Sequence, residues 1–304
     1  MSTTNFKLSF ITVNYNGFAD TRDLLLSIIS AKFTFTYEVI VIDNGSKEDE
    51  YSFLKEEFPC IKGRYLPTNL GFAGGNNVGL QMTNAEFLFF VNNDTFFPSD
   101  ANKQILEMLN FMEQKLYVGG ITPKIMYTEP KNLIQFAGCT SLSKITLRNK
   151  QIGYQEWDKG QYDRNSEIPY MHGAAMLVPH RVIRDVGMMS ELFFLYYEEL
   201  DWSCQIRKKY QLFYFAGAHI YHKESASTGA DSPLKIFYLT RNRLLFAYRN
   251  RYGIFRILSI LYLVALANPI KICKFMGMGK WKHLRATWLG MLSASRLFVK
   301  NNRS

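Results

Sequence analysis

The chain has 304 residues, of which 47% are apolar and 15% aromatic, so it can bury one large core or two small ones and is not a low-complexity chain. The net charge of +10 is uneven, because residues 241–304 hold 13 Lys and Arg and no Asp or Glu, whereas residues 1–240 balance at −3. The four cysteines form no CxxC pair, and the N-terminus lacks the layout of a signal peptide. We therefore expect free thiols and a cytoplasmic protein.

The first part of the chain alternates strand and helix patterns. Strands are expected at 7–16, 37–46, 61–67 and 86–93, and helices at 19–31, 47–58, 71–83 and 100–115. Ser46 followed by Asp49 is a capping-box pattern, which places the start of the second helix near residue 47. This alternation predicts a parallel sheet with helices on both of its faces.

The fourth expected strand ends in polar residues. In LFFVNNDTFF, residues 88–97, an apolar run stops at Asn92, Asn93 and Asp94 and then resumes. A turn explains this pattern, because Asn and Asp favour turns. A ligand site explains it too, because sheets of this kind bind ligands at the carboxyl ends of their strands. There Asp94 would offer carboxylate oxygens to a hard divalent cation.

After about residue 120 the pattern loosens. Residues 139–168 are polar and irregular, and they are followed by expected strands at 170–180 and 212–222 and by a long helix at 233–250. Between the two strands, three carboxylates crowd into four positions: Glu198, Glu199 and Asp201. Some of them can point into a cleft while others stabilise the start of a helix.

Three further features fit either a ligand or an ordinary structural role. NLGFAGGNNVGL, residues 69–80, matches neither the dinucleotide fingerprint nor the P-loop, so its glycines allow either a close ligand or a tight turn. Arg241 and Arg243 can clamp phosphate or solvate a helix. Asp43, at a strand tip, can accept a hydrogen bond from uracil or thymine, or form a turn.

The basic tail contains the apolar segment 253–272. Its apolar stretch from Ile257 to Ala267, which contains one Ser, is about half of the roughly 20 residues that a spanning helix needs. Apolar helices flanked by basic residues favour binding to an anionic membrane surface. The alternative is a core helix with Lys and Arg on its outer face, and we expect no nucleic-acid partner.

Taken in order, these segments resemble the family 2 glycosyltransferases, the inverting group with the GT-A fold, and in particular its rhamnosyltransferase-like bacterial members. The resemblance covers roughly residues 7–250. It is carried by eight collinear motifs, FITVNYNG, VIDNGS, NLGFAGGNNVGL, FFVNNDT, GAAMLVP, FFLYYEELDWSCQIR, HIYH and YLTRNRLLFAYR.

The resemblance implies site residues at the matching positions. The nucleotide-sugar pocket would be lined by Thr12, Asn14, Asp43, Asn69, Gly75, Asn76, Asn93 and Arg241. Asp94 and His222 would bind Mg²⁺ or Mn²⁺, although Asn92 stands where many relatives have Asp. Glu199 takes the position of the catalytic base, with Glu198 as the alternative, because the family usually has Glu-Asp there.

The resemblance also implies a function and a domain layout. We expect a GT-A domain at 1–250 and basic amphipathic helices at 251–304. The enzyme would transfer a sugar, with inversion, from dTDP-rhamnose or a UDP-hexose to a glycan or lipid-linked acceptor in cell-envelope polysaccharide biosynthesis, on the inner face of the membrane.

Two alternatives and one open point remain. The first alternative is a catalytically degenerate binding or scaffold protein. The second, a nucleotidyltransferase, fits less well, because the loop after the first strand has only Arg22 to bind a triphosphate. The oligomeric state is open.

Overall fold

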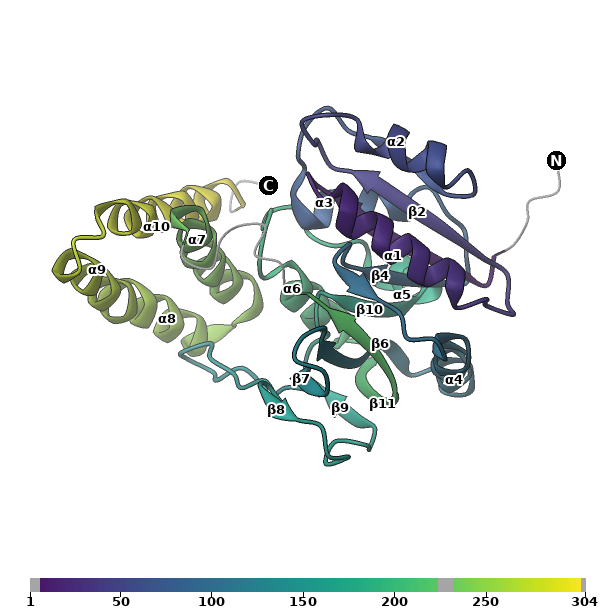
Figure 1. Ribbon diagram of the computed structural model, residues 1–304. Coiled ribbons are helices and arrows are strands. Elements are labelled where there is room, and N and C mark those ends of the chain that lie inside the picture. Colours follow the sequence, from purple (N-terminus) through teal and green to yellow (C-terminus); the bar gives the residue numbers. More distant parts are fainter. Residues whose placement is uncertain (1–5, 224–231, 302–304) are drawn as a thin grey trace.

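The computed structural model describes residues 6–223 and 232–301, and one mixed sheet forms the centre of this part of the molecule (Figure 1). The strands follow one another across it in the order β3-β2-β1-β4-β10-β6-β11-β5, and β7, β8 and β9 pair beside this path. The strand bounds are β1 (Leu8–Asn14), β2 (Tyr37–Asp43), β3 (Lys62–Tyr65), β4 (Phe87–Val91), β5 (Thr95–Phe96), β6 (Val118–Tyr127), β7 (Leu133–Phe136), β8 (Glu156–Trp157), β9 (Ser166–Ile168), β10 (Ala175–Pro179) and β11 (Gln211–His222).

Helices flank the sheet, and the last of them form a group beside it (Figure 1). Their bounds are α1 (Phe18–Ser30), α2 (Glu50–Glu57), α3 (Gly71–Leu80), α4 (Ala101–Gln114), α5 (His180–Val186), α6 (Glu198–Ile206), α7 (Pro233–Asn250), α8 (Gly253–Leu261), η1 (Tyr262–Ala267), α9 (Asn268–Gly277) and α10 (Trp281–Asn301). The expected helix at 233–250 is confirmed as α7.

The capping box expected at Ser46 is wrong. The second helix, α2, begins at Glu50, and its N-cap is Asp49, whose Oδ1 accepts from the backbone N–H of Ser52 at 3.0 Å. The hydroxyl of Ser46 accepts instead from the backbone N–H of Asn16 at 2.8 Å. A short capping pattern does not say which of two candidate residues adopts the cap geometry, because a nearby loop competes for the same hydroxyl.

The expected parallel half of the sheet is confirmed. Strands β3, β2, β1 and β4 run parallel, and the register aligns Asn14, at the end of β1, with Asp43, at the end of β2. All five residues of β4 are buried, which agrees with its uninterrupted apolar sequence. The carboxyl ends of these strands therefore meet at one edge of the sheet.

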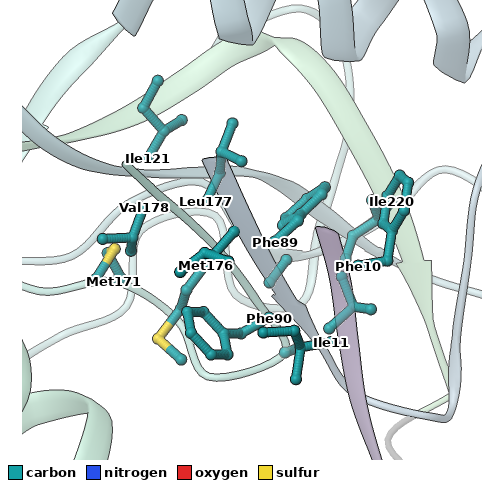
Figure 2. Close-up of a cluster of buried hydrophobic side chains, with 14 of the residues drawn as sticks. Phe10, Ile11, Phe89, Phe90, Ile121, Met171, Met176, Leu177, Val178 and Ile220 are labelled. Carbon is teal, nitrogen blue, oxygen red and sulfur yellow. The ribbon is translucent and has the colours of Figure 1, made fainter. Parts of the chain in front are cut away.

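Beyond β4 the sheet becomes mixed. Strand β10 runs antiparallel between β4 and β6, with Ala175 opposite Val91, and β11 runs parallel to β6. The antiparallel direction brings the loop before β10 to the same edge as the carboxyl end of β4. Figure 2 shows buried apolar side chains around these strands. Among them are Phe89 of β4 and Leu177 of β10, which lie opposite each other in the sheet.

The helices after the sheet form a second apolar cluster. Helix α7 packs on α10, and the buried side chains there include Leu245, Phe246 and Leu263. Helices α8, η1 and α9 form one helix over Gly253–Gly277 that, by its length and composition among the described residues, is long and apolar enough to cross a membrane. It is longer than the apolar stretch that the sequence singled out, and most of it is exposed.

Candidate active site

Asp94 and His222 meet at the sheet edge where the parallel strands end. Asp94 lies in the turn between β4 and β5, and His222 is the last residue of β11. The antiparallel pairing of β5 with β11 places Thr95 opposite His222, and the backbone N–H of Lys223 donates to the Asp94 carbonyl at 3.0 Å. As a result, Oδ1 of Asp94 lies 3.0 Å from Nε2 of His222, and both side chains are almost fully buried.

The hydrogen bonds of His222 test whether this pair fits a metal ion. Nδ1 of His222 lies 2.6 Å from Oε1 of Gln135, an oxygen that only accepts, so Nδ1 carries a proton. In a neutral imidazole the lone pair of Nε2 would then face the Asp94 carboxylate, which is repulsive unless a proton or a cation lies between them. A carboxylate oxygen and an imidazole nitrogen suit Mn²⁺, and a carboxylate suits Mg²⁺.

The two residues would be an incomplete ligand set. Within 6–223 and 232–301, no group of three or more His, Cys, Asp or Glu side chains is arranged to hold a metal ion. Asn92 lies next to the pair, with its Nδ2 3.4 Å from Nε2 of His222. Magnesium sites commonly use one or two protein ligands and complete the shell with water and substrate phosphate oxygens. The residues present therefore fit a metal ion that is shared with a phosphate-bearing ligand.

A cavity of about 380 Å³ opens beside this pair. It is lined by the strand-tip residue Asn92, by the start of α6 with Glu198 and Glu199, and by the loop before β10. The remaining lining residues are Phe72, Phe136, Asn149, Gln151, Tyr170, Met171, His172, Gly173, Ala174, Leu195, Tyr196 and Leu200. The volume suits a ligand of the size of a sugar or larger.

The two glutamates at the start of α6 have different surroundings. Glu198 is 2% exposed, and its Oε2 has no hydrogen-bond partner in the described part of the chain. Burial, reinforced by the charge of Glu199, raises the pKa of Glu198 to about 8. Burial also raises the pKa of Glu199, which lies close to Gly173 across the cavity. The pair therefore retains a proton near neutral pH, and one ionised carboxylate remains to accept another.

The residues expected in the nucleotide pocket cluster at the ends of β1 and β2. Both carboxylate oxygens of Asp43 accept backbone N–H groups, Oδ1 from Ser46 at 3.0 Å and Oδ2 from Glu50 at 2.8 Å. Asn14 donates to Glu50 at 2.7 Å and accepts from the Thr21 hydroxyl at 2.7 Å. Both side chains hold the loop before α2, so a direct contact of either with a nucleotide stays a prediction.

The other expected pocket residues have mixed surroundings. Oδ1 of Asn69 accepts from Asn44 at 3.0 Å and from the backbone N–H of Gly71 at 2.8 Å. A Cβ at Gly75 would lie 2.8 Å from Val13, so this glycine allows α3 to pack on β1. The side chain of Asn76 donates to the Phe72 carbonyl.

Two of the remaining candidates lie near the first strand. Asn93 donates to the Thr21 hydroxyl at 3.1 Å. The hydroxyl of Thr12 is buried and has no hydrogen-bond partner among the described residues. A buried hydroxyl without a partner is unfavourable, so Thr12 is the residue of this group whose environment most needs a further partner.

Arg241, which was expected to bind the nucleotide, forms hydrogen bonds with backbone carbonyls of the protein. Its guanidinium donates to the Leu192 carbonyl at 3.0 Å and to the Phe193 carbonyl, and it lies 4.8 Å from the ring centre of Tyr238. Burial lowers the pKa of Arg241, although arginine remains charged. A phosphate contact by Arg241 stays a prediction.

His172 lines the cavity, and the sequence did not predict it as a catalytic, nucleotide-binding or metal-binding residue. Its Nδ1 accepts the backbone N–H of Ala174 at 3.2 Å, so Nε2 carries the proton in the neutral ring. Burial, with a smaller contribution from His222, lowers the pKa of His172 to about 3. The ring is therefore a neutral hydrogen-bond donor at physiological pH, a role that the surrounding motif gave no reason to assign.

Comparison with known proteins identifies the family of this chain. Residues 9–187, more than half of the chain, match the family described as Glycosyl transferase family 2. The hexosyltransferase Agl10 of low-salt glycan biosynthesis in Haloferax volcanii is 25% identical over 210 residues, which are 66% of this chain and 62% of that protein. The uncharacterized glycosyltransferase YfnE of Bacillus subtilis is 32% identical over 126 residues, 40% of this chain and 31% of YfnE. Each match thus spans less than two thirds of the relative.

Solved structures show the same architecture. The mannosyltransferase PcManGT of Pyrobaculum calidifontis, in complex with GDP-Man and Mn²⁺, superimposes with a TM-score of 0.56 at 13% identity, over 99% of this chain and 81% of that chain. Residues 1–349 of S. aureus TarS superimpose with a TM-score of 0.54 at 16% identity, over 95% of this chain and 91% of that chain. These similarities concern the fold.

The chain belongs to glycosyl transferase family 2. Its fold is the mixed α/β GT-A fold that the sequence predicts, with a helical region at the C-terminus.

Proposed function

We propose that the protein is an inverting glycosyltransferase that moves a hexose or rhamnose from a nucleotide diphosphate sugar to a hydroxyl group of a glycan or a lipid-linked acceptor. The observation that carries this proposal is the cavity in which Glu198 and Glu199 face the strand tip at Asn92, next to the Asp94–His222 pair. One side of this cavity has carboxylates that can accept a proton. On the other side Asn92 lies beside His222, which together with Asp94 would hold a cation that binds diphosphate.

The residues in and beside the cavity would have different roles in the reaction. Glu199, partly exposed to the cavity, would accept the proton of the acceptor hydroxyl as that oxygen attacks the anomeric carbon. Glu198, whose pKa of about 8 keeps it protonated at neutral pH, would leave Glu199 as the ionised member of the pair. His172 would donate a hydrogen bond to an oxygen of the bound sugar. A divalent cation on Asp94 and His222 would neutralise charge on the departing diphosphate.

The relatives support the class of donor. Agl10 is named a hexosyltransferase, TarS has been solved with UDP and with UDP-GlcNAc, and PcManGT with GDP-Man. These names favour a hexose donor over rhamnose for this chain. Two structural neighbours, PcManGT and GalNAc-T7, were solved with Mn²⁺, which supports the proposed use of Mn²⁺ or Mg²⁺.

The C-terminal helices support a location at the inner face of the cell membrane, bound to its anionic surface. Apolar side chains are exposed along this region, among them Ile257, Leu261 and Trp281, on a segment that carries basic and no acidic residues. Tryptophan and apolar side chains favour the interface, and the basic residues are attracted to anionic lipid. A peripheral enzyme of this kind would hold its cavity near a lipid-linked acceptor of cell-envelope polysaccharide biosynthesis.

A donor screen tests the function. The purified protein is incubated with UDP-, GDP- and dTDP-sugars in Mn²⁺, with a lipid-linked or glycan acceptor, and release of the nucleoside diphosphate is measured. We expect one donor to be turned over and to raise the melting temperature, because a ligand that binds only the folded state stabilises it by mass action. A donor that binds without being hydrolysed or transferred under any condition would support the catalytically degenerate alternative instead.

A further inference from the structure

The backbone that leads into the catalytic helix α6 has an unfavourable conformation. Three residues just before or at its start, Phe194, Tyr196 and Tyr197, have φ angles of 66°, 69° and 78°. Bulky side chains rarely adopt this left-handed region, because Cβ crowds the backbone there. Such a turn persists only where the surrounding structure holds it, and it precedes Glu198 directly. The position of the two glutamates therefore depends on what holds residues 192–197.

Asn242 of α7 is the centre of what holds them. Its side chain is 0% exposed, and its Nδ2 donates to the backbone carbonyls of Phe193, Leu195 and Tyr196 at 2.9, 2.7 and 2.8 Å. These carbonyls belong to a turn without a regular ladder. Within the turn, the backbone N–H of Leu195 donates to the Phe193 carbonyl at 2.8 Å, and Asn242 adds donors from outside it. The two N–H groups of one amide thus serve three carbonyls of the turn, so at least one N–H is shared between two of them.

Arg241 fixes the orientation of that amide. Its Nε donates to Oδ1 of Asn242 at 2.8 Å, which directs the Nδ2 of Asn242 toward the turn. The same guanidinium donates to the carbonyls of Leu192 and Phe193. Two neighbouring residues of α7 therefore provide donors along the whole length of the turn.

The start of α3 holds the opposite side. The backbone N–H of Phe72 donates to the Phe194 carbonyl at 2.8 Å. A Cβ on Gly71, whose φ is +78°, would lie 2.2 Å from that carbonyl oxygen, so only glycine permits this approach. The turn is thus enclosed between α7 and the glycine-rich segment expected to border the nucleotide.

We propose that Asn242, oriented by Arg241, is a positioning residue that clamps the turn 192–197 and so sets the placement of Glu198 and Glu199 in the cavity. This inference rests on the proposed function. It assigns to this pair of α7 residues a role in the rate of sugar transfer that does not require contact with either substrate.

The test compares Asn242→Asp with the matched control Gln104→Ala. The aspartate has the same shape and loses both N–H donors, so its oxygens face three carbonyls. Gln104 of α4 is also a buried amide that bonds to backbone, accepting from His219 N–H at 2.8 Å, and it lies outside the cavity. Both changes are expected to lower the melting temperature. The control therefore shows what a loss of stability alone does to activity.

Only the Asn242 change is expected to alter catalysis in the folded protein. We expect kcat to fall about 100-fold, the scale of a roughly 1 Å misplacement, with the KM of the donor nearly unchanged. Hydrogen–deuterium exchange in a peptide covering 190–202 should become faster in Asn242→Asp and remain as in the wild type in Gln104→Ala.

The pH dependence of kcat/KM provides a second readout. Among the described residues, the charged or titratable groups near the two glutamates include Arg241 of α7 beside Glu198, Tyr197 beside Glu199, and His172 in the cavity wall. Burial raises the pKa of Tyr197 to about 12 and lowers that of His172 to about 3, so neither titrates within the assay range. Water entering a loosened turn should lower the raised pKa values of the glutamates, and the acid limb should move to lower pH.

The outcomes separate this inference from the proposed function. If the wild-type protein transfers no sugar, the proposed function fails, and the exchange experiment still reports whether Asn242 holds the turn. If the wild type is active and Asn242→Asp changes the melting temperature but leaves kcat, the acid limb and the exchange of 190–202 unaltered, Asn242 is a packing residue and the inference is wrong.

Discussion

Oδ1 of Asp94 lies 3.0 Å from Nε2 of His222, although one residue follows β4 and the other ends β11. The contact is made by the short antiparallel pairing of β5 with β11, which turns the chain back across the sheet edge. With Nδ1 of His222 donating to Gln135, Nε2 turns its lone pair toward the Asp94 carboxylate, an arrangement that a cation bound between the two side chains would stabilise.

The pair predicts metal-dependent activity. Asp94→Asn should abolish Mn²⁺ binding, measured by isothermal titration calorimetry on the protein with donor nucleotide, and should reduce turnover by several orders of magnitude. His222→Ala should weaken Mn²⁺ binding less, because the carboxylate remains. Glu86→Gln, an exposed carboxylate elsewhere, serves as the control. Normal metal dependence in Asp94→Asn would remove this residue from the site.

Glu199 and Glu198 should respond differently to the same substitution. Because burial and its neighbour keep Glu198 protonated near neutral pH, Glu198→Gln changes little in charge and should retain substantial transfer. Glu199→Gln cannot accept the proton and should bind the donor normally but lose transfer by about 100-fold or more. The measurement is single-turnover kinetics with each variant. The reverse order of activities would make Glu198 the base.

Glu198 should also affect how stability depends on pH. Its pKa rises from 4.5 to about 8 on folding, so between these pH values the folded state binds a proton that the unfolded state has lost. The free energy of unfolding therefore decreases as pH rises through this window. Glu198→Gln removes this effect. The melting temperature of the variant minus that of the wild type should therefore increase from pH 5 to pH 8. A constant difference across this range would contradict the raised pKa.

Asp43 should contribute to stability as well as to donor binding. In Asp43→Asn, the amide N–H groups would face the backbone N–H groups of Glu50 and Tyr51, which the carboxylate now accepts. We expect a loss of about 1–3 kcal/mol of unfolding free energy and a higher KM for the donor. Asp49→Asn is the control, because Asn caps a helix as well as Asp does. An unchanged donor affinity would limit Asp43 to its role in the loop.

The C-terminal helices should bind anionic vesicles. In co-sedimentation, binding should rise with anionic lipid and weaken, without disappearing, in high salt, since each basic residue near the surface contributes about 1 kcal/mol and the apolar contribution is not screened. Replacing the exposed Ile257, Leu261 and Ile270 with Ser should weaken binding, whereas Leu116→Ser, an exposed leucine before β6, should not. A full-length protein that remains soluble with every vesicle would show that these helices have another partner.

The sequence by itself determined the local part of this molecule. An uninterrupted apolar run predicts the buried strand β4, and the polar residues after it predict the position of Asp94 at a strand end. The helix pattern at 233–250 fixes α7. The family motifs add the GT-A fold, which the comparisons confirm. These features depend on residues close together in the chain, so their spacing contains the information.

Tertiary structure alone decided which of these residues meet. The antiparallel insertion of β10 between β4 and β6 brings His172 to the edge where β4 ends, and the pairing of β5 with β11 brings His222 to Asp94. The left-handed turn before α6 is held by Asn242, from a helix far along the chain. Such contacts depend on strand order and helix packing, and local periodicity does not specify either, because the same strands and helices are compatible with several arrangements.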